Sequence, residues 1–275
     1  MSPTVPTLRD AGFAPEAADR ISRTRAQLLG ACLDAAPNRL TGDTLPLLWH
    51  WVFFAPTIPT ADLGPDGHPL RSPEMNAFPQ RMWVGGRVQV NRPLDLDEEA
   101  IRTSRIASVA MKEGGSGHFW LVTVAHEIAQ RGECRISEEQ DLVFRSAGTL
   151  TRPGPDRLEP PHATWVEEFV ADPVLLFRFS AATSNAHRIH YDQPYATGVE
   201  GYPDLVVHGP LTAILLAEFG RRRAGRDYTD ISFRARAPHF ANRRCWLTGR
   251  VESDGTANVT AIRADGAEAM NLRAC

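Results

Sequence analysis

A short polar segment in the second half of the chain carries the residue types best suited to chemistry. Between Asn185 and Asp192 the sequence places two imidazoles, His187 and His190, beside an amide and a carboxylate. Histidine can accept and return a proton near neutral pH. We therefore interpret residues 183–192 as a candidate proton-transfer site.

A second segment, Val206-Val207-His208-Gly209-Pro210, comes directly before an apolar-periodic stretch that predicts a helix over residues 211–222. The first backbone N–H groups of a helix have no partner within it, so they can bind an oxygen that gains negative charge. Together the two segments offer what acyl-thioester chemistry needs. The alternative is a polar loop between a strand and a helix, whose histidines are solvated or structurally satisfied.

The sequence predicts a linker between the two halves and several strands in the second half. Residues 146–170 are irregular and rich in proline, which is typical of a connection between domains. We therefore expect one domain at residues 1–145 and another at 171–275. Alternating apolar and polar residues predict strands at 174–180, 230–236, 244–253 and 257–264.

The first half begins with a polar, helix-like region in which Pro15 is suited to start a helix running to about Ala35. A loop rich in proline and glycine, residues 55–79, is either a lid or a long connection. Beyond it, alternation predicts an antiparallel meander with one face in water. Its strands are expected at 81–90, 101–113, 118–130 and 135–145, with hairpin turns at 114–117 and 131–133. Each half thus offers a sheet and helical material, which is an α+β pattern.

Composition excludes several classes of protein. The 275 residues carry a net charge of −3, which gives no basic field for nucleic acid. Arginines at 221–223 and 243–244 form local clusters that are either solvated faces or an anion site. The four cysteines lie far apart, without metal-ligand spacing. Neither a signal-peptide core nor a run of about 18 apolar residues occurs, so we expect a cytoplasmic protein outside the membrane.

Residues 183–192 resemble the signature S-G-D-x-N-P-[IL]-H-x-D of the MaoC-like (R)-specific enoyl-CoA hydratases. The Val206-Val207-His208-Gly209 segment resembles the V-x-H-G motif that follows it in that family. In this register Asn185 stands at the family's catalytic Asp, His187 at its Asn and His190 at its catalytic His.

The first half supports the same family. Arg81-Met82-Trp83-Val84-Gly85-Gly86 and the EEQDLVFR stretch resemble the N-terminal domain of its two-domain members. These members include mitochondrial-type hydroxyacyl-thioester dehydratases and bacterial mesaconyl-C4-CoA and itaconyl-CoA hydratases. The resemblance covers residues 40–265. It implies an α+β double hotdog, in which two antiparallel sheets each wrap a central helix and join edge to edge. The first hotdog is expected to be degenerate and the second catalytic.

The resemblance also implies roles for individual residues. His190 is the expected acid–base group, and His187 orients the water or shares in proton transfer. Asn185 cannot act as a carboxylate base, but its amide can hold the water as donor and acceptor. Asp192 is expected to hold His190 in one tautomer, with a simple turn as the alternative. Gly209 opens the helix, so its N–H is expected to donate to the thioester oxygen.

Four further residues are candidates for substrate binding. Arg178, Arg188 and Arg243 are candidates for the CoA phosphates or a substrate carboxylate, and each can instead be a surface arginine. Arg188 is the candidate for bidentate pairing with a free carboxylate. His208 either closes the pocket or only packs. Hydration needs no redox centre, so no cofactor or metal is expected. A CoA thioester is the expected partner. A homodimer is compatible with this organisation.

The expected function is that of a hydro-lyase that adds water reversibly across the double bond of an unsaturated acyl-CoA. Mesaconyl-C4-CoA or itaconyl-CoA, hydrated to citramalyl-CoA, is the expected substrate. The alternative enzyme is an (R)-3-hydroxyacyl-thioester dehydratase of fatty-acid synthesis. The alternative outside the enzymes is a non-catalytic hotdog that binds acyl-CoA.

Overall fold

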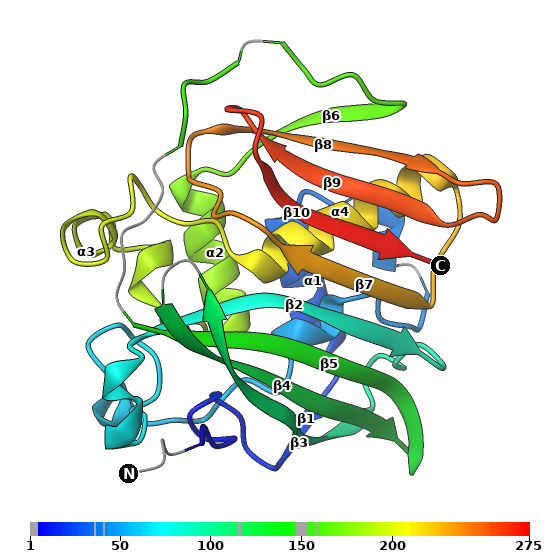
Figure 1. The fold of residues 1–275 in the computed structure, drawn as a ribbon. Coiled ribbons are helices and arrows are strands. Elements are labelled where there is room, and N and C mark those ends of the chain that lie inside the picture. The colour runs from blue at the N-terminus through cyan, green and yellow to red at the C-terminus, as the bar shows by residue number, and fades with distance from the viewer. Residues whose placement is uncertain (1–4, 36, 41, 115–116, 147–152, 158) are drawn as a thin grey trace.

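The protein is described by a computed structural model, which covers residues 5–35, 37–40, 42–114, 117–146, 153–157 and 159–275. The ten strands of these residues form one sheet in the order β1-β3-β4-β5-β2-β7-β10-β9-β8-β6, and each pair of neighbours is antiparallel. Figure 1 shows the strands of the first half below those of the second half, with the longest helix, α4, beside the upper strands.

The long strands of the first half lie where the alternation of the sequence predicts them. The turn after β4 has positive φ at both Arg131 and Gly132, 52° and 78°, as a two-residue hairpin turn requires. Residues 115 and 116 of the other predicted turn lie outside the described part of the chain. The four strands are β2 (Gln80–Val90), β3 (Glu99–Gly114), β4 (Gly117–Gln130) and β5 (Glu133–Arg145).

Three strands of the second half are also confirmed, namely β7 (Asp230–Ala235), β8 (Arg244–Val251) and β9 (Ala257–Arg263). Two strands of the second half were not predicted. One is β10 (Glu268–Ala274), which lies between β7 and β9. The other is β6 (Trp165–Val170), which pairs with β8 at the edge of the sheet although it falls in the stretch predicted to be a linker.

The helix predicted from Pro15 is wrong over its first part. Residues there form β1 (Glu16–Arg20), which pairs with the free edge of β3. Helix α1 (Arg23–Cys32) begins only after Ser22, whose Oγ accepts a hydrogen bond from the backbone N–H of Arg25. A long-range strand partner therefore outweighs local helical spacing in this region.

The strand predicted at residues 174–180 is also wrong, because this stretch forms helix α2 (Pro173–Thr183). Asp172 caps the helix by accepting a hydrogen bond from the N–H of Leu175 at 2.7 Å, and proline suits the first helical position. The buried side chains are spaced three and four residues apart, as a helix requires. They are Leu176, Phe179 and Ser180.

The two halves join edge to edge, as predicted, through the antiparallel pairing of β2 with β7. The backbones and side chains approach closely at this seam. A Cβ atom built on Gly86 would lie 2.5 Å from the carbonyl oxygen of Glu139 and 2.6 Å from the ring of Phe233. Glycine is therefore needed at this position for the two sheets to meet.

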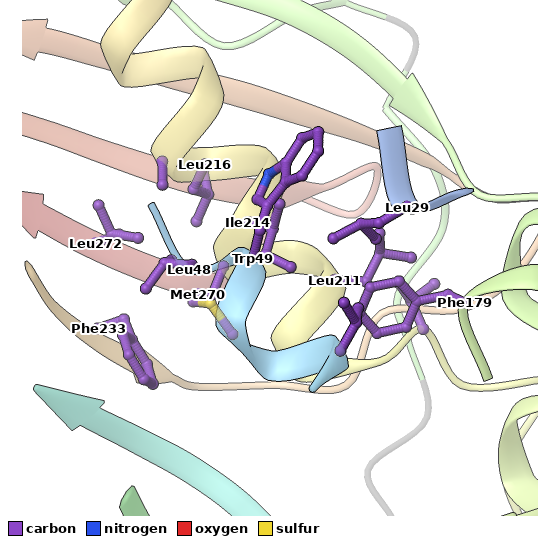
Figure 2. Packing of buried hydrophobic residues seen from close by; sticks show 14 of the residues in the cluster. Leu29, Leu48, Trp49, Phe179, Leu211, Ile214, Leu216, Phe233, Met270 and Leu272 are labelled. Carbon is purple, nitrogen blue, oxygen red and sulfur yellow. The ribbon is translucent and has the colours of Figure 1, made fainter. Parts of the chain in front are cut away.

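A long central helix is present in the second half, where α4 (Gly209–Ala224) packs against β8, β9 and β10. In the described part of the first half, α1 and short 3-10 helices take the place of such a helix. One of them, η2 (Trp49–Val52), contributes Trp49 to the main core. Figure 2 shows Trp49 among the side chains of α1, α2 and α4 that pack toward the strands of the second half.

A buried carboxylate ties η2 to the first sheet. Glu138 on β5 accepts hydrogen bonds from Nε2 of His50 at 3.0 Å and from Nε1 of Trp51 at 2.7 Å. Burial alone would raise the pKa of Glu138, but these hydrogen bonds and the neighbouring imidazoles lower it to about 2. The charged carboxylate thus fixes η2 where the first hotdog lacks a long helix. No helix of the described residues is long and apolar enough to cross a membrane.

Candidate active site

The two segments singled out in the sequence meet between α2 and α4. His190 ends the 3-10 helix η5 (Arg188–His190), and its Nδ1 lies 2.7 Å from the carbonyl oxygen of Val206. A carbonyl oxygen can only accept, so Nδ1 carries the proton, and the neutral ring has an acceptor at Nε2. That Nε2 atom has no hydrogen-bond partner among the described residues. His190 is thus held as a neutral base.

His208 packs directly against this base. The two rings are stacked, with centroids 3.7 Å apart and planes at 18°. Nε2 of His208 lies 2.8 Å from Oγ of Ser180, and the ring edge of Phe179 supports it at 4.9 Å. His208 was expected either to close the pocket or only to pack, and these contacts are those of a packing residue.

His187 stands on another side of His190, with ring centroids 5.4 Å apart and planes at 89°. Its backbone N–H donates to Oδ1 of Asn185 at 3.0 Å. The amide oxygen of Asn185 therefore braces the loop, while its NH₂ group is a donor that can hold a water or a substrate oxygen.

Two residues of the loop at 55–79 also belong to this site, and sequence reasoning missed both. The ring of His68 lies 4.0 Å from that of His187, and Nδ1 of His68 lies 3.1 Å from Oδ2 of Asp66. The sequence signal that was available is an Asp and a His two residues apart in a proline- and glycine-rich turn, Pro65-Asp66-Gly67-His68-Pro69. We call His68, His187, His190 and His208 the histidine cluster.

Burial keeps the histidine cluster uncharged at neutral pH. It lowers the pKa of His190 to about 4 and the pKa of His208 well below 6.5. Burial is also the main reason that the pKa of His187 lies well below its ordinary value, and His68, His190 and Arg81 add to the effect. The pKa of His68 is lowered by burial although its hydrogen bond to Asp66 opposes the change. The site therefore presents neutral imidazoles to a substrate.

Gly209 begins α4 directly after His208, so the free backbone N–H at this helix start lies beside the histidine cluster. A Cβ atom at this position would lie 2.7 Å from the ring of Trp83, which comes from β2. The indole in turn stacks on Phe233 at 4.6 Å. Only glycine fits between the start of the helix and this aromatic wall.

The roles expected for Asp192 and Arg188 do not agree with their contacts. Oδ1 of Asp192 caps α3 (Gln193–Gly198) by accepting from the N–H of Tyr195, and Oδ2 accepts from Arg188 at 2.7 Å. Asp192 therefore supports a turn, and the Val206 carbonyl orients His190 in its place. The guanidinium of Arg188 also donates to Pro65 and lies over the ring of Tyr195 at 3.9 Å. Arg188 thus holds the loops together, and its guanidinium is already engaged by Asp192, Pro65 and Tyr195.

Arg178 and Arg243 are likewise not part of the histidine cluster. Arg178 is exposed on α2, and Arg243 forms an ion pair with Asp156 within the Pro-rich stretch. A groove of about 430 Å³ crosses β2, β5 and β7, but its lining contains no member of the histidine cluster. We place the candidate site at the histidine cluster, because there an imidazole with an acceptor nitrogen lies beside the start of α4.

Two other arginines border the cluster. Arg81 lies on the same face of β2 as Trp83, and its Nη2 donates to the carbonyl oxygen of Ala11 at 2.7 Å. Arg71 donates through Nη2 to Asp66 at 3.1 Å. Nε of Arg81 and Nη1 of Arg71 are buried without a partner among the described side chains and backbone. Burial, followed by the charge of Arg71, lowers the pKa of Arg81 to about 10, so this guanidinium remains cationic at neutral pH.

Asp66, His68 and His187 place one potential ligand atom each within 4.8 Å of one another, which is close enough to consider a metal ion. The surroundings argue against a cation. The Asp66 oxygen that faces His68 is already paired with Arg71, and Arg81 adds a second positive charge nearby. The donor set therefore fits a hydrogen-bonded acid–base group better than a divalent metal.

Comparison with known proteins identifies the family. The model of the family "Hydroxyacyl-thioester dehydratase type 2" matches residues 48–241. A mesaconyl-C(4)-CoA hydratase of Chloroflexus aurantiacus is 41% identical over 264 residues, which are 94% of each chain. The structure of HtdX from Mycobacterium tuberculosis has a TM-score of 0.70 at 15% identity, over 95% of this chain and 99% of that one.

The fold expectation is confirmed by a second solved structure. A Mycobacterium tuberculosis protein described as having a double hotdog fold matches 98% of this chain and 97% of its own length, with a TM-score of 0.55 at 14% identity. In this fold the start of α4 carries Gly209 beside the histidine cluster, and Trp83 of β2 and Phe233 of β7 lie next to Gly209 at the seam of the two sheets. The chain is a double-hotdog protein and belongs to the hydroxyacyl-thioester dehydratase type 2 family of acyl-thioester hydratases and dehydratases.

Proposed function

We propose that this chain adds water reversibly across the double bond of an unsaturated C5 dicarboxylyl-CoA, mesaconyl-C4-CoA or itaconyl-CoA, to give citramalyl-CoA. The identity of 41% to a mesaconyl-C(4)-CoA hydratase supports the substrate class. The observation that carries the reaction type is the neutral His190, whose Nδ1 is bound to Val206 and whose Nε2 is left as an acceptor beside the start of α4.

The proposed chemistry uses three groups. The thioester oxygen lies at the N–H of Gly209, where the developing enolate charge is stabilised; such a donor is worth about 3–4 kcal/mol in the transition state. The attacking water donates a hydrogen bond to Nε2 of His190. As the water oxygen bonds to the β-carbon, a neutral imidazole of the histidine cluster takes a proton from the water and then returns it to the α-carbon. No net proton or electron is left over.

The free carboxylate of the substrate is proposed to bind Arg81 and Arg71, in place of Arg188. Both arginines have a buried nitrogen without a partner among the described residues. Together with Asp66 they give the edge of the histidine cluster a net charge of about +1, since the imidazoles are neutral. A carboxylate would neutralise this charge and satisfy the unused donors, whereas an uncharged acyl chain would do neither.

The proposal is tested by comparing kcat/KM for mesaconyl-C4-CoA, itaconyl-CoA and crotonyl-CoA, followed through the absorbance of the unsaturated thioester. We expect at least one dicarboxylyl-CoA to be preferred over crotonyl-CoA by about 10²-fold, the worth of one well-placed charge-assisted contact. Equal handling of crotonyl-CoA would exclude recognition of a carboxylate and favour a general enoyl-CoA hydratase. Failure to hydrate any of the three would contradict the proposed reaction itself.

A second candidate is a (R)-3-hydroxyacyl-thioester dehydratase of fatty-acid synthesis, which the matching family model favours by its description. The same histidine cluster could serve this reaction in the reverse direction, because a catalyst acts on both directions of an equilibrium. Turnover of a long-chain 3-hydroxyacyl thioester faster than citramalyl-CoA would establish this alternative.

Two predictions about organisation also belong to the proposal. The first is that residues 171–275 form the catalytic hotdog and residues 1–145 the degenerate one, on either side of the proline-rich stretch. The second is a homodimer, which light scattering on the purified chain would test against a monomer of 30.3 kDa.

A further inference from the structure

The turn at residues 64–68, which belongs to the first half of the chain, is docked on the segment that carries His187 and His190. The backbone N–H of Arg188 donates to the carbonyl oxygen of Asp66 at 2.9 Å, and the Arg188 guanidinium donates to Pro65 at 2.9 Å. The contact is so close at Gly67, which has a φ of +87°, that a Cβ atom there would lie 1.8 Å from the carbonyl oxygen of Ala186. This turn is therefore an integral wall of the site.

Within the turn, a carboxylate holds an imidazole in one tautomer. Oδ1 of Asp66 accepts from the backbone N–H of His68 at 3.0 Å, and Oδ2 lies 3.1 Å from Nδ1 of the same residue. Because a carboxylate only accepts, Nδ1 of His68 carries its proton and Nε2 is left as the acceptor. Arg71 donates to the same Oδ2, and these contacts keep the pKa of Asp66 below its usual value despite burial.

The site thus contains two directed neutral bases of different strength. His190 is backed by a carbonyl, whereas His68 is backed by a charged carboxylate. A carboxylate stabilises the imidazolium that forms when the ring accepts a proton, and a neutral carbonyl does so less well. His68 therefore has the better means to keep a proton during the reaction, while His190 can fix the position of the water.

The site has no carboxylate at position 185, where the resembling family has its catalytic Asp. Asn185 cannot act as a base, and the oxygen of its amide is already bound to the N–H of His187. Among the described residues, Asp66 is the carboxylate that forms a hydrogen bond with a ring of the histidine cluster, at Nδ1 of His68.

Resting on the proposed function, we propose that His68 is a catalytic residue supplied by the first half of the chain, and that Asp66 is its positioning residue. Nε2 of His68 takes a proton from the water as the water oxygen bonds to the β-carbon. The π electrons of the double bond pass toward the thioester oxygen, and the imidazolium then returns the proton to the α-carbon. The water is added without gain or loss of charge, and His68 ends as the neutral ring.

The experiment uses the full chain with His68→Ala and Asp66→Asn, and the control is Asp62→Asn, the same substitution at an exposed position of the same loop. We expect His68→Ala to lower kcat by about 10²–10⁴-fold with little change in KM. Imidazole added to the buffer should restore part of this activity, because it can occupy the space of the lost ring and carry the proton. Asp66→Asn should lower kcat by at least about tenfold, while the control stays within twofold of the parent.

Several outcomes would overturn the inference. The first is that the parent chain hydrates an enoyl-CoA and that the kcat of the His68→Ala chain lies within about threefold of the parent value. Another is a loss that imidazole does not restore and that comes with a lowered Tm, since this is the behaviour of a purely structural residue. A parent chain without hydratase activity on any thioester tested would instead remove the proposed function, so the two failures are distinguishable.

Discussion

The imidazole rings of His190 and His208 lie face to face, with centroids 3.7 Å apart. Each ring is also fixed by a separate hydrogen bond, to the Val206 carbonyl for His190 and to Ser180 for His208. The stack is compatible with neutral rings, since two imidazolium ions at this distance would repel each other. Burial lowers the pKa of both residues and so maintains this state. Each ring thereby restricts the orientation of the other.

Replacement of His190 by alanine is expected to leave the fold intact and to lower hydration of unsaturated acyl-CoA by about 10²–10⁴-fold, because the Nε2 acceptor that positions the water for proton transfer is lost. His187→Ala should cost less, because the ring of His187 lies beside His190 and has no hydrogen-bond partner that fixes its tautomer among the described residues. Steady-state kinetics with circular dichroism as the folding control would check both. Activity of His190→Ala within a few-fold of the parent would exclude His190, and equal losses would indicate a mechanism with two equivalent histidines.

Stability is expected to fall steeply between pH 6.5 and pH 4. The pKa values of the buried His126, His190 and His239 are each lowered from 6.5 to about 4, so these residues stay neutral in the folded protein. As the pH falls below 6.5, the unfolded chain binds protons first, which favours unfolding. Stability is therefore full above the unfolded pKa and is lost toward pH 4.

The size of this effect can be measured by urea unfolding at pH 7.5, 5.5 and 4.5. Each histidine corresponds to at most about 3 kcal/mol over the full range. His239→Gln should flatten the dependence by removing the contribution of this one histidine. An unfolding free energy that is unchanged between pH 7.5 and 4.5 would show that these rings are protonated or solvated in the folded protein.

Gly209→Ala is expected to destabilise the protein by about 1–3 kcal/mol, as overpacking in a filled core usually does, and to lower kcat by moving the start of α4. The new Cβ atom would meet the Trp83 ring at 2.7 Å, and Phe233 stacks on that ring. Gly198→Ala is the matched control, because no atom lies within 4 Å of its Cβ position. Thermal melts and kinetics on both variants check this, and parent-like values for Gly209→Ala would contradict the close fit.

Arg81→Gln is expected to lower kcat/KM for a dicarboxylyl-CoA by about 10²-fold while changing that for crotonyl-CoA little, since it removes a charge-assisted contact to the carboxylate. Arg188→Gln should lower both values by a similar factor, because Arg188 pairs with Asp192 and supports the loop. The ratio of the two kcat/KM values is the measurement, and it does not depend on the fraction of folded protein. If the ratio differs from that of the parent in Arg188→Gln and not in Arg81→Gln, Arg188 is the residue that binds the carboxylate.

Local sequence patterns were sufficient for much of the fold and for part of the site. Period-two alternation identified β2 to β5 and β7 to β9, and the apolar stretch after Pro210 identified α4. The residues 183–192 identified His187 and His190, which the structure indeed brings together. These features are encoded by neighbours in the chain, because side-chain period and helix starts depend on residues only a few positions apart.

Other features depended on contacts between distant parts of the chain. Whether residues 16–20 form a helix or a strand was decided by the free edge of β3. Whether Arg188 or Arg81 has an unused donor depended on which acceptors the fold places around each guanidinium. Asp66 and His68 joined the histidine cluster only because the turn at 64–68 packs against Ala186 and Arg188. Sequence therefore determined which residues can move protons, whereas packing decided which of them meet, because burial and hydrogen-bond partners arise only when remote segments come into contact.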